Sequence, residues 1–202
     1  MDSITIDNGC RRLSRLQQAH VVNKNALFLL DEHQISIPDD LYHYIEDFDE
    51  NKVTYHSEQP TSEKLLTACQ DACVIRDLIL SSLQDNEDVL LLNRFISEQI
   101  ILNPDGSFES IRDGKTLTST TLNNPAAPDS TIRKKAGETY HDFSGNFAET
   151  METDTNRKFI DSADFQPNIY SDSQFCKDEI QKMAEAGDTT SVFVELVSGL
   201  RG

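Results

Sequence analysis

Apolar positions recur at helical spacing through most of the first hundred residues. The first apolar stripe predicts a helix over about 9–22, and residues 23–25 interrupt it. The apolar run at 26–32 then predicts a short buried helix in preference to a strand. Pro38 with two aspartates directly after it predicts another helix start, because the ring fixes φ and the carboxylates suit the positive end of the helix dipole.

Two longer helices are predicted next. Residues 61–84 carry one apolar stripe, and the stretch from Lys64 to Leu83 contains neither glycine nor proline. A second amphipathic pattern predicts a helix over about 86–100. Because the link between the two is short, we expect them to pack as an antiparallel pair.

After residue 100 the hydrophobic period changes from helical to alternating. Residues 100–102 and 107–111 have the composition of strands, and an Asn-Pro-Asp-Gly turn separates them. This arrangement predicts a β-hairpin. A second Asp-Gly pair at 113–114 predicts a further turn before a short strand at 115–118.

The chain then becomes polar over residues 116–173. This segment is rich in Ser, Thr, Asn, Asp and Pro, and its aromatic residues follow no period, which predicts a long and partly flexible excursion. Regular structure is predicted to return with a helix over 174–186, which Gly187 ends. The β-branched run at 191–197 predicts a final strand.

Together these patterns predict an α+β fold with a predominantly helical N-terminal half, a small antiparallel β-hairpin sheet, and a C-terminal helix and strand. We expect three parts. Residues 1–115 form a helical body with the hairpin, 116–173 form the polar excursion, and 174–202 form a helix and strand that pack back on the body.

The net charge of the chain limits the kinds of partner that it can bind. The 202 residues include 35 acidic and 18 basic side chains, which gives a net charge of −17. Nucleic acids and anionic membranes bind clustered Lys and Arg, so this balance argues against both. An acidic surface attracts basic protein surfaces, and we therefore expect a protein partner with a basic or apolar surface.

Two further features bear on location. The longest apolar runs fall short of the roughly 18 residues that span a bilayer, and the acidic N-terminus does not resemble a signal peptide. The four cysteines show no spacing typical of a disulfide framework. We therefore expect a cytoplasmic protein with no membrane insertion.

One arrangement of residues permits an enzymatic alternative. Cys10 begins a predicted helix and is followed by two arginines, a setting that favours a thiolate. His141 and Asn146 follow at the distances found in papain-like enzymes, in which they serve as base and orienting residue. However, no side-chain donor for an oxyanion hole stands just before Cys10, and polar residues surround His141. We therefore prefer to interpret Cys10 as a small residue at a helix start and His141 as a solvated loop histidine.

Metal and phosphate sites are poorly supported. Residues 47–58 place oxygen ligands at several positions of an EF-hand loop, but Lys52 stands where the loop needs glycine, so a solvated acidic loop is the better interpretation. Cys69 and Cys73 lie on an apolar stripe, where cysteine usually fills core space rather than binding zinc. The glycine-rich motifs that bind phosphates are absent from the sequence. We expect neither a metal nor a cofactor.

The sequence thus predicts a non-catalytic protein–protein interaction module, an adaptor or chaperone-like subunit of the kind found in bacterial secretion systems. Five apolar residues are candidates for its partner-binding face, although periodicity alone does not separate that face from the core: Leu65, Leu66, Leu80, Leu90 and Phe95. The alternative is a papain-like cysteine hydrolase or deamidase of the effector type that uses Cys10, His141 and Asn146.

Overall fold

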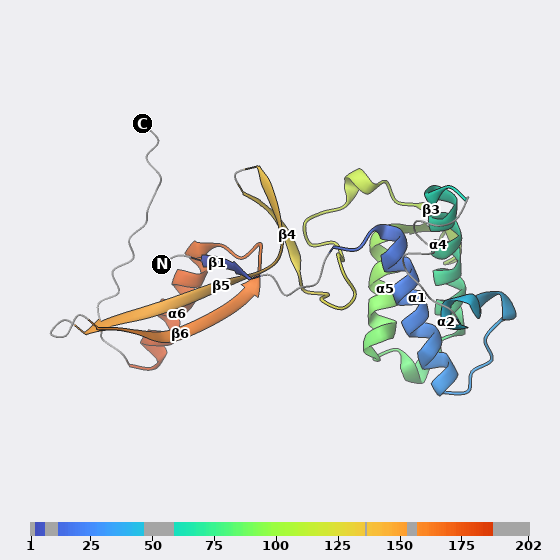
Figure 1. Ribbon diagram of the computed structural model, residues 1–202. Coiled ribbons are helices and arrows are strands. Elements are labelled where there is room, and N and C mark those ends of the chain that lie inside the picture. The colour runs from blue at the N-terminus through green and yellow to red at the C-terminus, as the bar shows by residue number, and fades with distance from the viewer. Residues whose placement is uncertain (1–2, 7–11, 47–58, 136, 153–156, 188–202) are drawn as a thin grey trace. The chain divides into compact units, whose positions relative to one another are not determined.

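The computed structural model describes residues 3–6, 12–46, 59–135, 137–152 and 157–187 (Figure 1). The chain divides into two compact units. Cys10–Asp129 form a helical unit, and Met1–Gly9 together with Ser130–Gly202 form a sheet unit. The predicted α+β class and the helical N-terminal half are confirmed.

The helical unit is built on three main helices, α1 (Arg15–Glu32), α4 (Thr61–Leu78) and α5 (Glu87–Gln99). The short helix α2 (His43–Glu46) follows the 3-10 turn Asp39–Leu41, so the predicted start after Pro38 is confirmed. The core lies between the three long helices and takes in Leu41 and Tyr44 from this short region.

Helix α1 differs from its prediction at both ends. It begins at Arg15, where Ser14 accepts a hydrogen bond from the Gln17 amide and the Gln17 side chain accepts one from the Ser14 amide. It then continues to Glu32 without a break, so the predicted interruption at 23–25 was wrong. The buried Asn23 amide is accommodated because its Nδ2 donates to the Ala68 carbonyl on α4.

Helix α4 is shorter than the predicted helix over 61–84, whereas α5 is close to the predicted helix over about 86–100. Residue Ile79 is extended and ends α4, and the 3-10 turn Ser81–Leu83 occupies the remainder of the predicted 61–84 helix. Helix α5 begins at Glu87, directly after the N-cap residue Asn86, whose side chain accepts a hydrogen bond from the Asp88 amide.

The hairpin of strands β2 (Ile100–Leu102) and β3 (Phe108–Ile111) is confirmed. Its turn closes with a hydrogen bond from the Gly106 amide to the Asn103 carbonyl, and Gly106 has a φ of +87°, which few other residues adopt. The predicted strand at 115–118 was wrong, because Gly114–Thr116 form a 3-10 turn that Asp113 caps.

The sheet unit occupies much of the segment that we predicted to be a polar excursion. Strands β4 (Thr131–Lys135), β5 (Glu138–Glu152) and β6 (Arg157–Pro167) join β1 (Ser3–Ile6) in a four-stranded antiparallel sheet. The prediction missed these strands because their residues are largely polar. Several of these polar side chains find hydrogen-bond partners within the unit, as in the hydrogen bond from Ser144 Oγ to Asn168.

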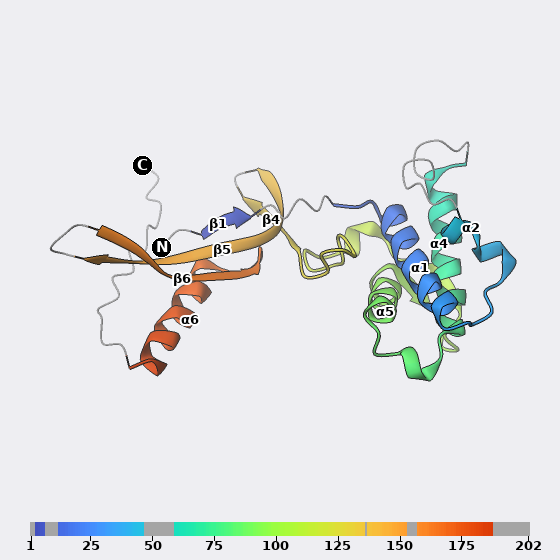
Figure 2. The same ribbon diagram turned by 60° about the horizontal axis from the view of Figure 1, so that its bottom comes forward.

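Helix α6 (Asp172–Glu185) packs on the sheet through β5, and its Phe175 is buried (Figure 2). The predicted helix over 174–186 is confirmed within two residues, and Gly187 follows with a φ of +72°. Helix α6 belongs to the same compact unit as the strands of the sheet. The predicted strand at 191–197 lies outside the described residues.

Among the helices that the structure describes, none is both long and apolar enough to cross a membrane.

Candidate functional site

A polar cluster lies where α1, α2 and α4 meet. The Tyr44 hydroxyl on α2 donates to Asp71 Oδ2 on α4 at 2.6 Å, and the Tyr44 side chain is 1% exposed. The rings of His20 on α1 and of the neighbouring His43 lie 5.0 Å and 4.1 Å from the Tyr44 ring, measured between centroids. These contacts join three helices around one aromatic ring.

Burial controls the charge state of this cluster. Desolvation raises the pKa of Tyr44, and the Asp71 carboxylate adds to the effect, so the phenol stays protonated. Burial also raises the pKa of Asp71, although the hydrogen bond from Tyr44 opposes the shift. The pKa of His20 falls to about 4, chiefly through desolvation and further through the charges of His43 and Lys64. His20 is therefore neutral at physiological pH.

This cluster has acid and base groups but little access for a substrate. Tyr44 and His20 are 1% and 6% exposed, so neither presents a reactive atom at the surface. Their arrangement suits a structural role in which α2 is fastened to α4 by a hydrogen bond to a half-buried carboxylate. Sequence reasoning missed this cluster because its members come from distant segments.

The cysteines of α4 belong to the core. Cys69 and Cys73 are 0% and 5% exposed, which confirms their interpretation as core residues. Burial raises the pKa of Cys69 to about 12, so its thiol is neither a ready nucleophile nor a ready metal ligand. Within the described residues, no cluster of three or more His, Cys, Asp or Glu side chains could hold a metal ion.

The residues of the enzymatic alternative are described only in part. Cys10 and the loop 47–58 lie outside the described residues. His141 lies in β5 opposite Ile132, in the sheet unit. Asn146 pairs with strands on both sides of β5 and is 3% exposed, which suits a residue in the interior of the sheet.

The five candidate partner-binding residues separate into two kinds. Phe95 is fully buried between the helices, so its assignment to a partner-binding face is corrected to a core position. Leu65 is half-buried and packs against the same core. In contrast, Leu66, Leu80 and Leu90 are exposed by 39%, 53% and 53%.

Other exposed apolar side chains of the helical unit were not singled out from the sequence: Phe28, Val74 and Ile101. A wheel drawn on the observed helix places Val74 opposite the buried face of α4. The sequence alone does not reveal that Val74 is exposed, because other apolar residues of α4 lie at the margin of its apolar stripe and obscure which face is buried.

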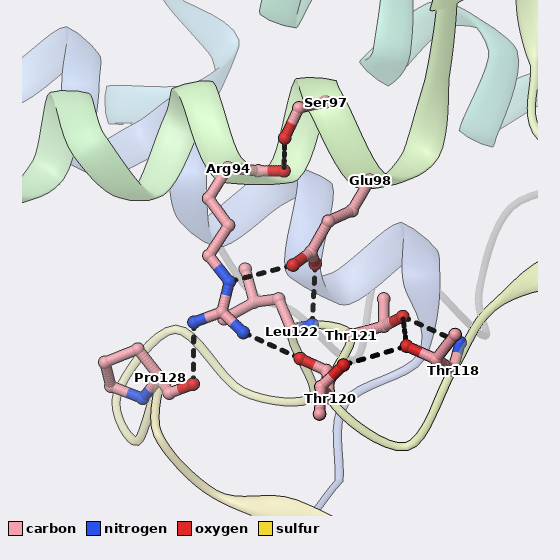
Figure 3. A network of polar contacts seen from close by, with 8 residues as sticks. All are labelled: Arg94, Ser97, Glu98, Thr118, Thr120, Thr121, Leu122 and Pro128. Atoms are coloured by element: carbon pink, nitrogen blue, oxygen red, sulfur yellow. Dashed lines mark hydrogen bonds and ion pairs between the residues drawn. The ribbon is translucent and has the colours of Figure 1, made fainter.

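A hydrogen-bonded network fastens the segment after the hairpin to α5 (Figure 3). The Arg94 guanidinium pairs with Glu98 at 2.9 Å and donates to the carbonyls of Thr120 and Pro128, each at 2.8 Å. Glu98 also accepts a hydrogen bond from the Leu122 amide at 2.7 Å. The segment therefore has a defined path along α5, where buried Leu122 joins the core.

Comparison with protein-family models, with curated proteins and with solved structures found no match to this chain.

Proposed function

We propose that this protein is a non-catalytic interaction module that binds a protein partner with a basic and apolar surface. The observation that carries the proposal is the exposure of Leu80 and Leu90, each 53% exposed, at the junction of α4 and α5. Leu80 directly precedes the 3-10 turn after α4, and Leu90 lies in the first turns of α5. We call these two leucines the leucine pair.

The start of α5, which carries Leu90, is well anchored. Asn86 caps α5 through the Asp88 amide, and the Asp88 carboxylate accepts a hydrogen bond from Asn25 on α1 at 3.0 Å. A rigid platform loses little conformational entropy on binding, so exposed side chains on it are suited to recognition. An exposed leucine without such support would be a weaker candidate.

Acidic residues flank the leucine pair in the sequence. Asp77, Asp85 and Glu87 are all exposed, and the whole chain carries a net charge of −17. Such a surface attracts basic partners and repels acidic ones, while the apolar side chains supply the contact area that a stable complex needs. This combination supports an adaptor or chaperone-like role in the cytosol, such as that of a subunit serving a bacterial secretion system.

The test compares three forms of the full chain as bait in lysate of the native cell. Leu80→Ser with Leu90→Ser should lose the partners of the wild type, because it removes the apolar contact. Val74→Ser is the matched control, since Val74 is 47% exposed on another part of the unit and should leave binding intact. Raising the salt concentration should weaken capture by the wild type. Unchanged capture by the double variant would contradict the proposal.

A further inference from the structure

Helices α1 and α5 pack side by side and run in opposite directions (Figure 1). Arg15, the first residue of α1, donates to Gln99 at the end of α5. Further along α1, Asn25 donates to Asp88 in the first turn of α5. The residues of α1 that follow Asn25 therefore lie beside the beginning of α5, at the end of the helical unit that also carries Leu90.

Phe28 is an apolar side chain at this end that the packing of α1 leaves partly uncovered. It follows Asn25 by three positions, which places it on the same side of α1 and one turn nearer to the end of the helix. Its side chain is 40% exposed, and Lys24 Nζ lies 5.5 Å from the centroid of its ring. Phe28 therefore adds an aromatic residue to the end that carries Leu90, and exposed aromatic residues often dominate the energy of protein interfaces.

Exposed carboxylates lie at the same end of the helix pair. Asp31 and Glu32 close the last turn of α1, and Asp85 and Glu87 stand directly before and in the first turn of α5. None of these four side chains forms an ion pair with another residue that the structure describes. Six residues make up the surface that we call the acidic end: Phe28, Asp31, Glu32, Asp85, Glu87 and Leu90.

Two of these carboxylates stand where a helix disfavours negative charge. The C-terminal end of a helix carries partial negative charge, which repels carboxylates in the last turn. Glu87 suits the positive end of α5, whereas Asp31 and Glu32 oppose the dipole of α1, and no basic residue lies in the last turn of α1 to offset them. Charges that lower the stability of the free protein are typical of functional surfaces, and a cation brought beside them relieves the repulsion.

We propose that the acidic end binds a peptide segment of a partner protein in which lysine or arginine residues flank leucine-like side chains. Phe28 supplies apolar contact beside the leucine pair, and the carboxylates of Asp31 and Glu32 pair with the basic side chains of the segment. Charge complementarity identifies this occupant, because a neutral or acidic segment would leave the carboxylates without opposite charge. Repulsion disfavours a second copy of the chain, whose net charge is −17.

This inference rests on the proposed function and adds Phe28, Asp31 and Glu32 to its binding surface. The probe is a fluorescein-labelled synthetic peptide of leucine and lysine whose leucines align along one side of a helix. Fluorescence anisotropy at 0.15 M salt should show saturable binding to the full chain. Matched peptides with glutamate in place of lysine, or serine in place of leucine, should not bind.

Three variants of the full chain locate the contact. Asp31→Asn with Glu32→Gln should weaken binding about fivefold, and Phe28→Ser about tenfold, because each removes one kind of contact. Glu109→Gln with Asp129→Asn is the matched control. It removes two charges from exposed positions outside the acidic end, so its affinity should stay within about twofold of the wild type.

Urea unfolding distinguishes recognition from a structural role. The variant Asp31→Asn with Glu32→Gln should unfold at a higher urea concentration than the wild type, because it removes negative charge from the end of α1, although it binds the peptide more weakly. A lower unfolding midpoint would show that the two carboxylates support the fold, and would overturn the proposal. Circular dichroism checks that Phe28→Ser retains the fold.

The variant Leu80→Ser with Leu90→Ser, titrated with the same peptide, separates this inference from the proposed function. If it loses the peptide while Phe28→Ser and the Asp31 and Glu32 variant bind as the wild type does, the inference is overturned and the leucine pair is supported. If only the latter two lose the peptide, the inference stands and the role of the leucine pair fails. A wild type that does not bind the lysine peptide, or a control variant that weakens binding equally, would also overturn the inference.

Discussion

Acid should destabilise the helical unit through His20. The ring is 6% exposed and its pKa in the folded chain is about 4, against 6.5 for an unperturbed histidine. Above pH 6.5 the ring is neutral in both states, so the native packing contributes in full. As the pH falls, the unfolded chain takes up a proton first, and stability is lost between pH 6.5 and 4. At pH 4.5 this loss amounts to about 2.5 kcal/mol.

The assay is urea unfolding at pH 7.5 and pH 4.5, followed by circular dichroism at 222 nm. The variant His20→Gln has no titrating ring, so its stability should fall by about 2.5 kcal/mol less than that of the wild type between the two pH values. His33→Gln is the control, because it removes an exposed histidine that follows the end of α1 and keeps the His20 ring. An equal fall for the wild type and His20→Gln would refute this explanation.

Three further outcomes follow from the burial and contacts of single side chains. Tyr44→Phe should lower the free energy of unfolding by about 1.5–3 kcal/mol in urea titrations, because it removes a hydrogen bond to a half-buried carboxylate. Phe95→Ala should cost about 3–5 kcal/mol in the same assay, whereas Leu90→Ala should cost under about 0.5, since the first is fully buried and the second 53% exposed. An electrophilic thiol probe read by mass spectrometry should label half-buried Cys176 well before Cys69, and comparable rates would contradict the burial of the latter.

Local signals predicted the elements that depend on local contacts. The β2–β3 hairpin follows from a turn sequence that suits Gly106, and α5 follows from an amphipathic stripe behind a capping asparagine. Helix α1 was harder to predict because α2, α4 and α5 all contact it. The buried face of α1 is therefore wider than the narrow apolar stripe that identifies an amphipathic helix. Asn23, which in the sequence suggests an interruption of the helix, instead donates a hydrogen bond to α4.

The sheet could not be predicted because its stability comes from distant partners. Strand β1 pairs with β5 across about 140 residues, as in the pairing of Ser3 with Asn146. Polar residues such as Ser162 lie in β6 because α6 provides a hydrogen-bond partner, and a single sequence does not reveal such pairs. Periodicity did not separate exposed apolar residues from buried ones. Leu66, Leu80 and Leu90 are exposed, but the same pattern also selected the core residue Phe95.

Site-specific photo-cross-linking in the native cell tests the proposed interaction role most directly. A photoreactive residue placed at Leu80 or Leu90 should give a discrete adduct with a partner protein. The same residue at Glu109, an exposed acidic position on β3, should give none. Absence of any adduct from both leucine positions, or equal adducts from all three, would contradict the proposal that the leucine pair binds a protein.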